Sequence, residues 1–482
     1  MDELIKMSAC EVVELLRAGD ISPKELIEKA ASRIEKVDLH VNALPTRCYD
    51  RAMKRAYKLA TMKGKRNPKS FLYGLPIAVK DTAGVEGVRT TYGSRIFANH
   101  VPIKSDIYVS TLEANGALII AKSNAPEFGA GANTFNDVFG DTRNPWNTSL
   151  TSGGSSGGSA AALATGQVWL ATGSDLGGSL RIPAGFCSVV GFRPSPGRVA
   201  KGPDPLPFDT LSVVGPMARC VSDVALMLDA MVGMQEEDPI SLPRPRKRFR
   251  DALKQCKVPK RIAFSLDLNG LVRMDAEVAD VCLAAISQIP KLGADVTENS
   301  PCFDAMKDVI GVLRDCWFAL PLYGHMKDNH HLLKEEILHS IQSGLKLSAL
   351  EVVNAEIARG MLYGHIVEFF KKYDVLLVPT TITQPFDVRK RYLEEANGER
   401  FDNYVEWFLI TYFLSLTACP ILSLPVGFTP AGLPVGLQVI AAPRQDTTVL
   451  GFAYLLEELL GTGKTPIDPI YGTALTKPTN HT

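Results

Sequence analysis

Apolar residues recur at helical spacing at the start of the chain, as Val12, Leu15 and Leu16 illustrate. Two tetrapeptides lie among them, Ser-Ala-Cys-Glu at 8–11 and Ser-Pro-Lys-Glu at 22–25. Both fit the capping box, in which a serine and a glutamate three residues later satisfy the free amides at a helix start. The second also has proline at the first helical position, where its missing amide hydrogen is not needed. We therefore predict two N-terminal helices that pack on a larger body.

After Phe71 the pattern changes to short apolar runs separated by glycine, proline and asparagine. Such runs are typical of buried strands, which we expect at 76–79, 117–121, 168–172, 262–265, 375–378, 421–426 and 435–441. Helical stretches such as 108–115 lie between them, and this alternation predicts an α/β sheet with both faces covered. The last two runs flank Thr-Pro-Ala-Gly at 429–432, which predicts a hairpin and therefore a mixed sheet.

The length of 482 residues exceeds one usual compact core, so the chain forms either two or three domains or one large layered structure. The best candidate for a connection is 238–260, which holds four prolines and several basic residues. A nuclear address or an anion patch would use such a sequence. The zero net charge favours a solvated connection instead.

Composition and charge narrow the range of functions. Lysine plus arginine and aspartate plus glutamate both number 52, so no net field recruits nucleic acid or an anionic membrane, and a small substrate that is uncharged or of mixed charge fits better. No apolar run reaches the about 18 residues of a membrane helix, and the first residues lack a basic signal-peptide start. The nine cysteines are scattered and never form Cys-x-x-Cys, which predicts reduced thiols in a cytoplasmic protein.

Two clusters of glycine and serine, at 151–159 and 173–179, are the most unusual part of the chain. Composition alone is typical of a flexible linker. However, the first cluster leads into the Ala-rich run 160–164 and the second follows the predicted strand 168–172, so both lie at ends of packed elements. Glycine lets the backbone turn sharply there, and successive amide hydrogens can surround a developing oxyanion.

Two other glycine-rich motifs fit less well. A phosphate-binding loop needs lysine after its last glycine, and here Ser159 follows Gly158. The Gly-x-Ser-x-Gly pattern of a nucleophile elbow occurs twice, centred on Ser155 and on Ser156. A loop-like sequence rather than a strand precedes it, and no downstream histidine lies in a Gly-rich strand end.

The stretch 153–159, followed by 173–193, resembles the signature sequence of the amidase signature family of serine amidohydrolases. Further blocks similar to that family span nearly the whole chain, at 74–81, 122–128, 140–146, 373–380 and 432–438. The resemblance implies an α/β/α sandwich with a large mixed, twisted β-sheet covered by helices on both faces. It implies a single domain over 1–482, composed of an N-terminal helical region (1–65), a signature core (66–235), a linker-like segment (236–260) and a C-terminal half (261–482).

The catalytic residues of the family carry over to matching positions. The resemblance implies that Ser179 is the nucleophile, that Ser155 is the bridging serine after a cis peptide bond, and that Lys80 is the base. It assigns the oxyanion hole to four backbone amides, those of Leu176, Gly177, Gly178 and Ser179. Three further side chains would support these residues: Asp175, Arg181 and Ser156. Neither a metal nor a cofactor is expected.

Elementary chemistry agrees with these roles. An alcohol becomes a nucleophile when a base takes its proton. The pKa of a lysine amine in water is about 10.4, so lysine acts as a base only if desolvation lowers that pKa by several units. Lys80 follows the apolar residues 77–79, which can bury its stem, and the Ser155 hydroxyl can relay a proton because it both donates and accepts. Ser179 would then attack an amide carbonyl and form an acyl-enzyme.

Three functions stay open. The first is a free-standing amidase that acts on small carboxamides, alone or as a homodimer like similar enzymes. The second is the A subunit of a tRNA-dependent amidotransferase, which shares the signature but usually has glutamine where this chain has Ile182. The third is a catalytically dead binding protein, which the joint presence of Lys80, Ser155 and Ser179 disfavours.

Other clusters give weaker indications. His331, Glu335 and His339 have the spacing of metal ligands along one helix face, but their charged neighbours favour a solvated face. Cys187 and Cys419 have no basic neighbour to lower their pKa, so we expect them in the core.

Substrate choice is expected to depend on the region 300–417, which carries no readable motif. Four aromatic residues of this region fit either an acyl pocket or core packing: Trp317, Trp407, Phe408 and Tyr412.

Overall fold

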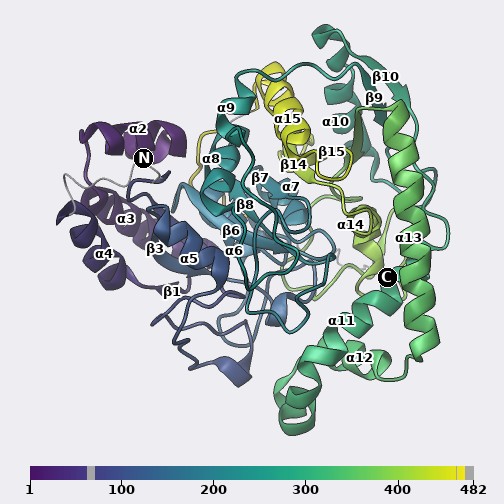
Figure 1. Cartoon of the computed structure of the whole chain (residues 1–482), viewed down its shortest axis with the longest axis horizontal. Helices are drawn as coiled ribbons and strands as arrows, with labels where there is room; N and C mark the ends of the chain where they lie inside the picture. The colour runs from purple at the N-terminus through teal and green to yellow at the C-terminus, as the bar shows by residue number, and fades with distance from the viewer. Residues whose placement is uncertain (62–70, 463, 473–482) are drawn as a thin grey trace, which may run out of the picture.

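The computed structural model describes residues 1–61, 71–462 and 464–472 (Figure 1). One sheet of eleven strands has the order β1-β3-β2-β6-β8-β7-β14-β15-β11-β9-β10. In chain order its strands are β1 (Thr46–Arg47), β2 (Pro76–Lys80), β3 (Leu118–Ser123), β6 (Leu170–Asp175), β7 (Val190–Arg193), β8 (Val213–Ala218), β9 (Arg261–Phe264), β10 (Asp295–Glu298), β11 (Val375–Pro379), β14 (Ile421–Phe428) and β15 (Pro434–Ile440). Two small hairpins lie outside it, formed by β4 (Arg143–Asn144) with β5 (Asn147–Thr151) and β12 (Glu395–Ala396) with β13 (Glu399–Arg400).

Helices surround the sheet, as Figure 1 shows. The α-helices are α1 (Glu3–Lys6), α2 (Ala9–Ala18), α3 (Pro23–Val41), α4 (Tyr49–Thr61), α5 (Ile107–Ala114), α6 (Gly157–Ala164), α7 (Arg181–Cys187), α8 (Val221–Met231), α9 (Phe249–Leu253), α10 (Ala276–Ile286), α11 (Met306–Asn329), α12 (Glu335–Gly344), α13 (Ala349–Lys372), α14 (Leu409–Ser415) and α15 (Asp446–Leu460). Short 3-10 helices lie at Arg95–Phe97, Glu127–Gly129, Ile289–Leu292, His330–Leu332 and Glu406–Phe408.

The sheet is mixed, as predicted. β2 runs parallel to β3 and β6, and β9 runs parallel to β10 and β11, whereas the other neighbouring strands are antiparallel. β14 and β15 form the predicted hairpin, in which the amide of Gly432 donates to the Thr429 carbonyl at 2.8 Å. Every strand predicted from an apolar run is present, and the α/β fold class is confirmed.

β11 illustrates why these strands are continuous apolar runs. Val375 and Leu377 belong to one hydrophobic core, whereas Leu376 and Val378 belong to the other. Successive side chains of a strand point to opposite faces, so both faces of β11 are buried. Without a polar face, such a strand shows no apolar–polar alternation.

The two predicted N-terminal helices are α2 and α3. The Ser8 side chain accepts from the Glu11 amide while the Glu11 carboxylate accepts from the Ser8 amide, so the first capping box is complete. At α3 the Ser22 side chain accepts from the Glu25 amide, with proline at the helix start. The predicted boundary between 1–65 and 66–235 lies outside the described residues.

The segment 236–260 is tied to the body at several points. The Arg244 guanidinium donates to the carbonyl oxygens of Asp229 and Val232, both at 2.7 Å. The Asp229 carboxylate in turn accepts from the amides of Phe249 and Arg250 at the start of α9. These contacts attach the segment to the end of α8, and its role as a connection between two halves stays a prediction.

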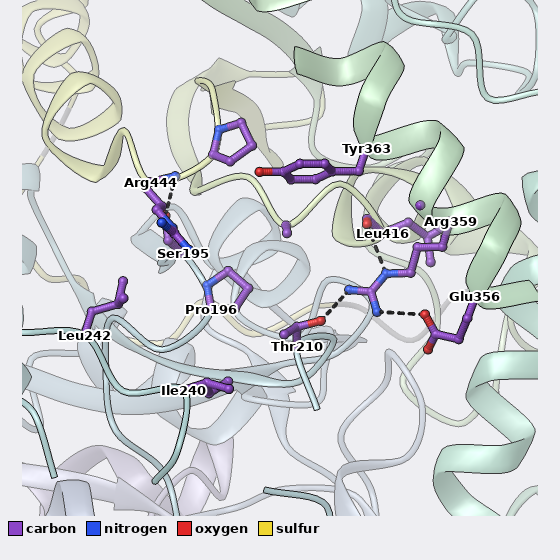
Figure 2. Close-up of a pocket in the computed structure, with 13 residues that line it drawn as sticks. Ser195, Pro196, Thr210, Ile240, Leu242, Glu356, Arg359, Tyr363, Leu416 and Arg444 are labelled. Atoms are coloured by element: carbon purple, nitrogen blue, oxygen red, sulfur yellow. Dashed lines mark hydrogen bonds and ion pairs between the residues drawn. The ribbon is translucent and has the colours of Figure 1, made fainter. Parts of the chain in front are cut away.

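A cavity of about 400 Å³ lies between α13 and the loops that follow β7 and α14 (Figure 2). Arg359 of α13 points toward Thr210, to whose hydroxyl it donates at 2.8 Å, and its Nε donates to the Leu416 carbonyl at 3.3 Å. The Glu356 carboxylate lies 3.7 Å from the same guanidinium. No predicted site residue is among those that line this cavity, so the candidate site lies elsewhere.

Candidate active site

Lys80 is the last residue of β2, a strand in which every residue is buried. Its amide donates to the Thr172 hydroxyl of the neighbouring strand β6 at 3.0 Å, which fixes the end of β2 against the sheet. β2 lies inside the sheet between β3 and β6, and the Lys80 side chain is 1% exposed. A lysine at this strand end is therefore buried rather than solvated.

The Lys80 amine donates to the hydroxyls of Ser155 and Ser174, at 2.6 and 3.0 Å. Neither partner is charged, and no carboxylate forms an ion pair with this amine within the described ranges. Burial lowers the pKa of Lys80 to about 7, although the charge of Asp175 acts in the opposite direction. A substantial fraction of this amine is therefore neutral near pH 7 and able to accept a proton.

Ser155 lies directly before α6, and the Gly154–Ser155 peptide bond is cis. Its side chain is 1% exposed. The next residue joins the two glycine-serine clusters: the Ser156 amide donates to the Ser179 carbonyl oxygen at 3.1 Å. The Ser156 hydroxyl also accepts from the Ser174 amide at 3.4 Å. The structure thus brings Lys80, Ser155 and the backbone of Ser179 together.

Ser179 lies in the turn between β6 and α7 and is half-buried. Within the described parts of the chain its hydroxyl has no hydrogen-bond partner. An unpaired, partly accessible hydroxyl has the exposure that a nucleophile requires.

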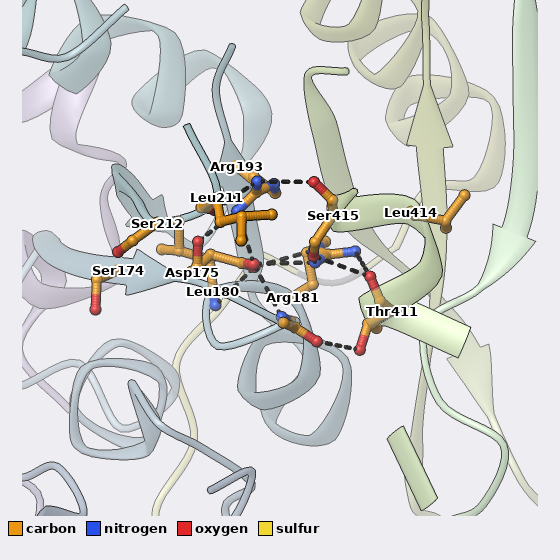
Figure 3. A network of polar contacts seen from close by, with 12 residues as sticks. Ser174, Asp175, Leu180, Arg181, Arg193, Leu211, Ser212, Thr411, Leu414 and Ser415 are labelled. Carbon is orange, nitrogen blue, oxygen red and sulfur yellow. Dashed lines mark hydrogen bonds and ion pairs between the residues drawn. The ribbon is translucent and has the colours of Figure 1, made fainter. Parts of the chain in front are cut away.

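The turn between β6 and α7 surrounds the carboxylate of Asp175 (Figure 3). This carboxylate accepts from the amides of Gly178 and Leu180 at 2.9 and 3.1 Å. It also accepts two bonds from the Arg181 guanidinium, both at 2.9 Å, and forms an ion pair with Arg193 at 3.2 Å. All three charged side chains are fully buried.

Charge pairing dominates the ionisation of Asp175. Burial acts to raise the pKa of this carboxyl, but the guanidiniums of Arg181 and Arg193 outweigh burial and hold the pKa below its usual range. Asp175 therefore stays ionised and keeps its amide and guanidinium donors.

Arg181 links the turn to distant elements. Its guanidinium donates to the Thr411 carbonyl at 2.9 Å, to the Ser415 hydroxyl at 2.6 Å and to Gln438 Oε1 at 2.7 Å. Two of these acceptors belong to α14 and the third to β15. The support predicted for Arg181 thus extends to the C-terminal half of the chain.

Arg193 belongs to the same network, although our sequence reasoning gave it no role. It lies at the end of β7, fully buried, and donates to the Asp175 backbone carbonyl as well as to the Asp175 side chain. The only sequence signal is its position at the end of the signature stretch, directly after an apolar strand.

One of the four amides predicted for the oxyanion hole has another partner. The Gly178 amide donates to the Asp175 carboxylate at 2.9 Å, so it is not free for a ligand. The amides of Leu176, Gly177 and Ser179 have no acceptor among the residues described. The assignment of an oxyanion hole to these three stays a prediction.

The predicted metal-like trio does not share a helix face. His331 lies in the 3-10 helix His330–Leu332, and α12 begins only at Glu335, so the prediction that they line one helix with His339 was wrong. A separate turn forms because Leu333 at its end has extended backbone, which breaks the helical repeat. The described residues hold no cluster of histidine, cysteine and carboxylate suited to a metal ion.

The four aromatic candidates divide into two groups. Trp407, Phe408 and Tyr412 are buried in the hydrophobic core that α14 shares with β11, whereas Trp317 is partly buried and donates to Asp209 at 3.2 Å. Cys187 and Cys419 are both buried, as expected of core cysteines.

No helix in the described part of the chain is both long and apolar enough to span a membrane.

Comparison with known proteins gives consistent matches. The family model described as Amidase matches residues 25–450. An acylamidase of Rhodococcus erythropolis is 32% identical over 92% of this chain and 93% of its own length. The A subunit of the glutamyl-tRNA(Gln) amidotransferase of Moorella thermoacetica is 33% identical over 95% of this chain and 97% of its own. The crystal structure of a bacterial aryl acylamidase of the amidase signature family is 28% identical, with a TM-score of 0.87 over 95% of this chain and 97% of that one.

Proposed function

The chain belongs to the amidase signature family of amidohydrolases, and from this premise we propose that it hydrolyses a small carboxamide with Ser179, Ser155 and Lys80. The observation that carries the proposal is the buried Lys80 amine, which lies 2.6 Å from the Ser155 hydroxyl without a carboxylate partner. The segment of Ser155 also contacts the turn that carries Ser179, because the Ser156 amide donates to the Ser179 carbonyl oxygen at 3.1 Å.

Proton transfer begins at the neutral Lys80 amine. Lys80 takes the proton of Ser155, and Ser155 takes that of Ser179 as the Ser179 oxygen attacks the amide carbonyl carbon. The carbonyl oxygen gains negative charge, which the free amides of Leu176, Gly177 and Ser179 stabilise.

Collapse of the tetrahedral intermediate breaks the carbon–nitrogen bond. The proton held at Lys80 returns through Ser155 to the leaving nitrogen, so ammonia or an amine departs and an acyl ester on Ser179 is left. Water, deprotonated by the same relay, then attacks this ester and releases a carboxylate. No metal or cofactor takes part in this scheme.

A second candidate function is that of an amidotransferase A subunit, because the relative from Moorella thermoacetica is as similar as the acylamidase. In that case the chain would release ammonia from glutamine within a complex. Ile182, where the A subunit usually has glutamine, supports the free-standing amidase instead. This side chain is buried at the start of α7 beside the candidate oxyanion turn.

The test combines covalent labelling with a substrate panel. A fluorophosphonate probe should label wild type at Ser179, whereas Ser179→Ala should show neither labelling nor amide hydrolysis. Ser212→Ala removes a nearby serine outside the proposed machinery and should behave as wild type. Aryl, alkyl and glutamine amides are then compared by amine or ammonia release, and turnover of glutamine alone would favour the amidotransferase function. Substantial hydrolysis by Ser179→Ala would refute the proposal.

A further inference from the structure

We infer that Thr411 is a positioning residue for the oxyanion hole, because its hydroxyl fixes the orientation of the Gly177–Gly178 peptide. The inference rests on the proposed function, since it concerns the turn that would hold the oxyanion. Thr411 lies in α14, and its Oγ1 donates to the Gly177 carbonyl oxygen at 2.6 Å across a sequence separation of 234 residues. Neither the signature sequence nor its flanking blocks contain Thr411.

The Thr411 hydroxyl has one proton and two carbonyl oxygens near it. Its Oγ1 lies 2.6 Å from the Gly177 oxygen and 2.8 Å from the Phe408 oxygen. A hydroxyl donates only one hydrogen bond, and the shorter distance assigns the proton to Gly177. The Gly177 carbonyl has no other donor among the described residues, and Gly177 is buried, so loss of this bond would leave a buried acceptor unpaired.

The Gly177–Gly178 peptide is held at both ends. Thr411 binds its carbonyl oxygen, and Asp175 Oδ1 accepts from its amide at 2.9 Å. In a trans peptide the carbonyl and the amide hydrogen point in opposite directions, so these two bonds together fix the peptide plane.

Two further carbonyls of the turn, those of Gly178 and Asp175, also accept hydrogen bonds from the protein. The Gly178 oxygen accepts from the amides of Arg181 and Ile182, at 2.9 and 2.8 Å, so the Ser179 amide points away from α7. The Asp175 carbonyl accepts from Arg193, which likewise directs the Leu176 amide to the other side. With Thr411 in place, every carbonyl of the turn that accepts a hydrogen bond faces the protein, and the free amides of Leu176 and Ser179 point the other way.

Loss of the Thr411 hydroxyl would leave the Gly177–Gly178 peptide held at one end only. Without the Thr411 bond, only the bond from the Gly178 amide to Asp175 would hold this peptide, and the peptide could rotate about it. The amides of Gly177 and Ser179, which flank the peptide in the chain, would then no longer be fixed against a developing oxyanion. Thr411 therefore acts through the backbone, and we do not place it in contact with substrate.

Packing between α14 and the turn agrees with this role. A Cβ added at Gly177 would lie 2.7 Å from the Tyr412 ring, and one added at Gly178 would lie 2.3 Å from Thr411 Oγ1. Gly178 also has a φ of +131°, which L side chains rarely adopt. The turn thus lies directly on α14, and only glycine at both positions allows the hydroxyl to approach the backbone.

Thr411→Val tests the inference, because valine has the shape of threonine without its donor. Fluorophosphonate labelling of Ser179 is the readout, since phosphonylation also places negative charge on an oxygen and requires no known substrate. We expect the labelling rate to fall about 10- to 100-fold, as for a slightly misplaced catalytic group, with the pH at half-maximal rate unchanged. Thr411→Ser, which keeps the hydroxyl, should recover most of the rate.

Thr417→Val is the matched control, because Thr417 is also buried and its hydroxyl donates to a carbonyl, that of Leu414, at 2.6 Å. It should label as wild type does. Melting temperatures show whether each variant folds. If Thr411→Val does not, Thr411→Cys replaces the hydroxyl with a weaker donor and should label more slowly than Thr411→Ser.

Several results would overturn the inference. These are a wild-type labelling rate in Thr411→Val or Thr411→Cys, an equal loss in Thr411→Ser, or a shift of the pH midpoint, which would place the effect at Lys80. Absence of labelling at Ser179 in the wild type would instead refute the proposed function, so the two failures are distinguishable.

Discussion

The Lys80 amine lies 2.6 Å from the Ser155 hydroxyl, and among the residues that the structure describes it binds one other side chain, the Ser174 hydroxyl. A buried lysine usually has a carboxylate partner, as Lys122 has in Asp81 at 3.1 Å. Lys80 has two neutral partners instead, so its surroundings favour the neutral amine. This difference between two fully buried lysines is the physical basis of the proposed chemistry.

The labelling rate of Ser179 should depend on pH through Lys80. Burial lowers the pKa of Lys80 to about 7, and only the neutral amine accepts a proton. The rate should therefore be low at pH 5, rise through about pH 7 and level off above pH 8. Fluorophosphonate labelling across this range measures it, and a rate that rises only near pH 10 would show an unperturbed lysine.

Removal of the base should cost most of the activity. Lys80→Met keeps an unbranched side chain without the amine, and we expect the labelling rate to fall about 10²- to 10⁴-fold, the usual contribution of a general base. Lys346→Met removes an exposed lysine outside the proposed machinery and serves as the control. Equal labelling of Lys80→Met and wild type would contradict the assignment.

The burial of Lys80 should lower the free energy of unfolding at neutral pH. The folded pKa of Lys80 lies below the unfolded one, so between about pH 7 and pH 10 the unfolded chain binds more protons than the folded chain. The free energy of unfolding of wild type should therefore rise with pH relative to that of Lys80→Met over this window. Urea denaturation of both proteins at pH 7 and pH 9 measures the difference, and a constant difference would contradict a buried neutral amine.

Loss of one charge from the Asp175 network should destabilise the fold. Asp175→Asn leaves the buried guanidiniums of Arg181 and Arg193 without their carboxylate, and breaking such a buried pair costs about 3–5 kcal/mol. Glu368→Gln breaks an exposed ion pair with Lys371 and should cost less than about 1 kcal/mol. Denaturant unfolding compares the two variants, and equal losses would argue against a structural role of the network.

Alanine should impair labelling when it replaces Gly178 and should stabilise the fold when it replaces Gly364. Gly178→Ala places a Cβ 2.3 Å from Thr411 Oγ1, so the turn must shift and the labelling rate of Ser179 should fall steeply. Gly364→Ala, in the exposed part of α13, meets nothing within 4 Å and should raise the free energy of unfolding by about 0.5–1 kcal/mol through helix propensity. Urea unfolding and labelling are measured on both variants. Unchanged labelling in Gly178→Ala would show that the turn tolerates a shift.

Much of the fold could be predicted from local sequence. β11 and β15 are apolar runs because both faces of each strand are buried. β7, β8 and β10 were not predicted. β7 and β8 contain glycine or proline that interrupts the apolar run, and β10 is a largely exposed edge strand with alternating polar residues.

The candidate site was predictable only in part. Lys80, Ser155 and Ser179 lie in motifs with a recognisable sequence, and the structure brings their segments together. Thr411 and Arg193 could not be assigned, because their roles depend on contacts with the turn at 175–179. No local pattern marks a threonine whose partner lies 234 residues away, and a buried arginine at a strand end has no signature of its own.

The proposed mechanism depends on the ionisation of Lys80. Selective ¹³C labelling of lysine Cε, followed by NMR across pH 5 to 11, measures the pKa of each amine, and Lys80→Met identifies the signal. The proposed mechanism predicts that this signal titrates near pH 7. Burial also lowers the pKa of Lys334, to about 8, so the comparison with Lys80→Met is needed to assign the signal. A midpoint near 10 would mean that the amine beside Ser155 is charged at neutral pH, which would contradict the proposed mechanism.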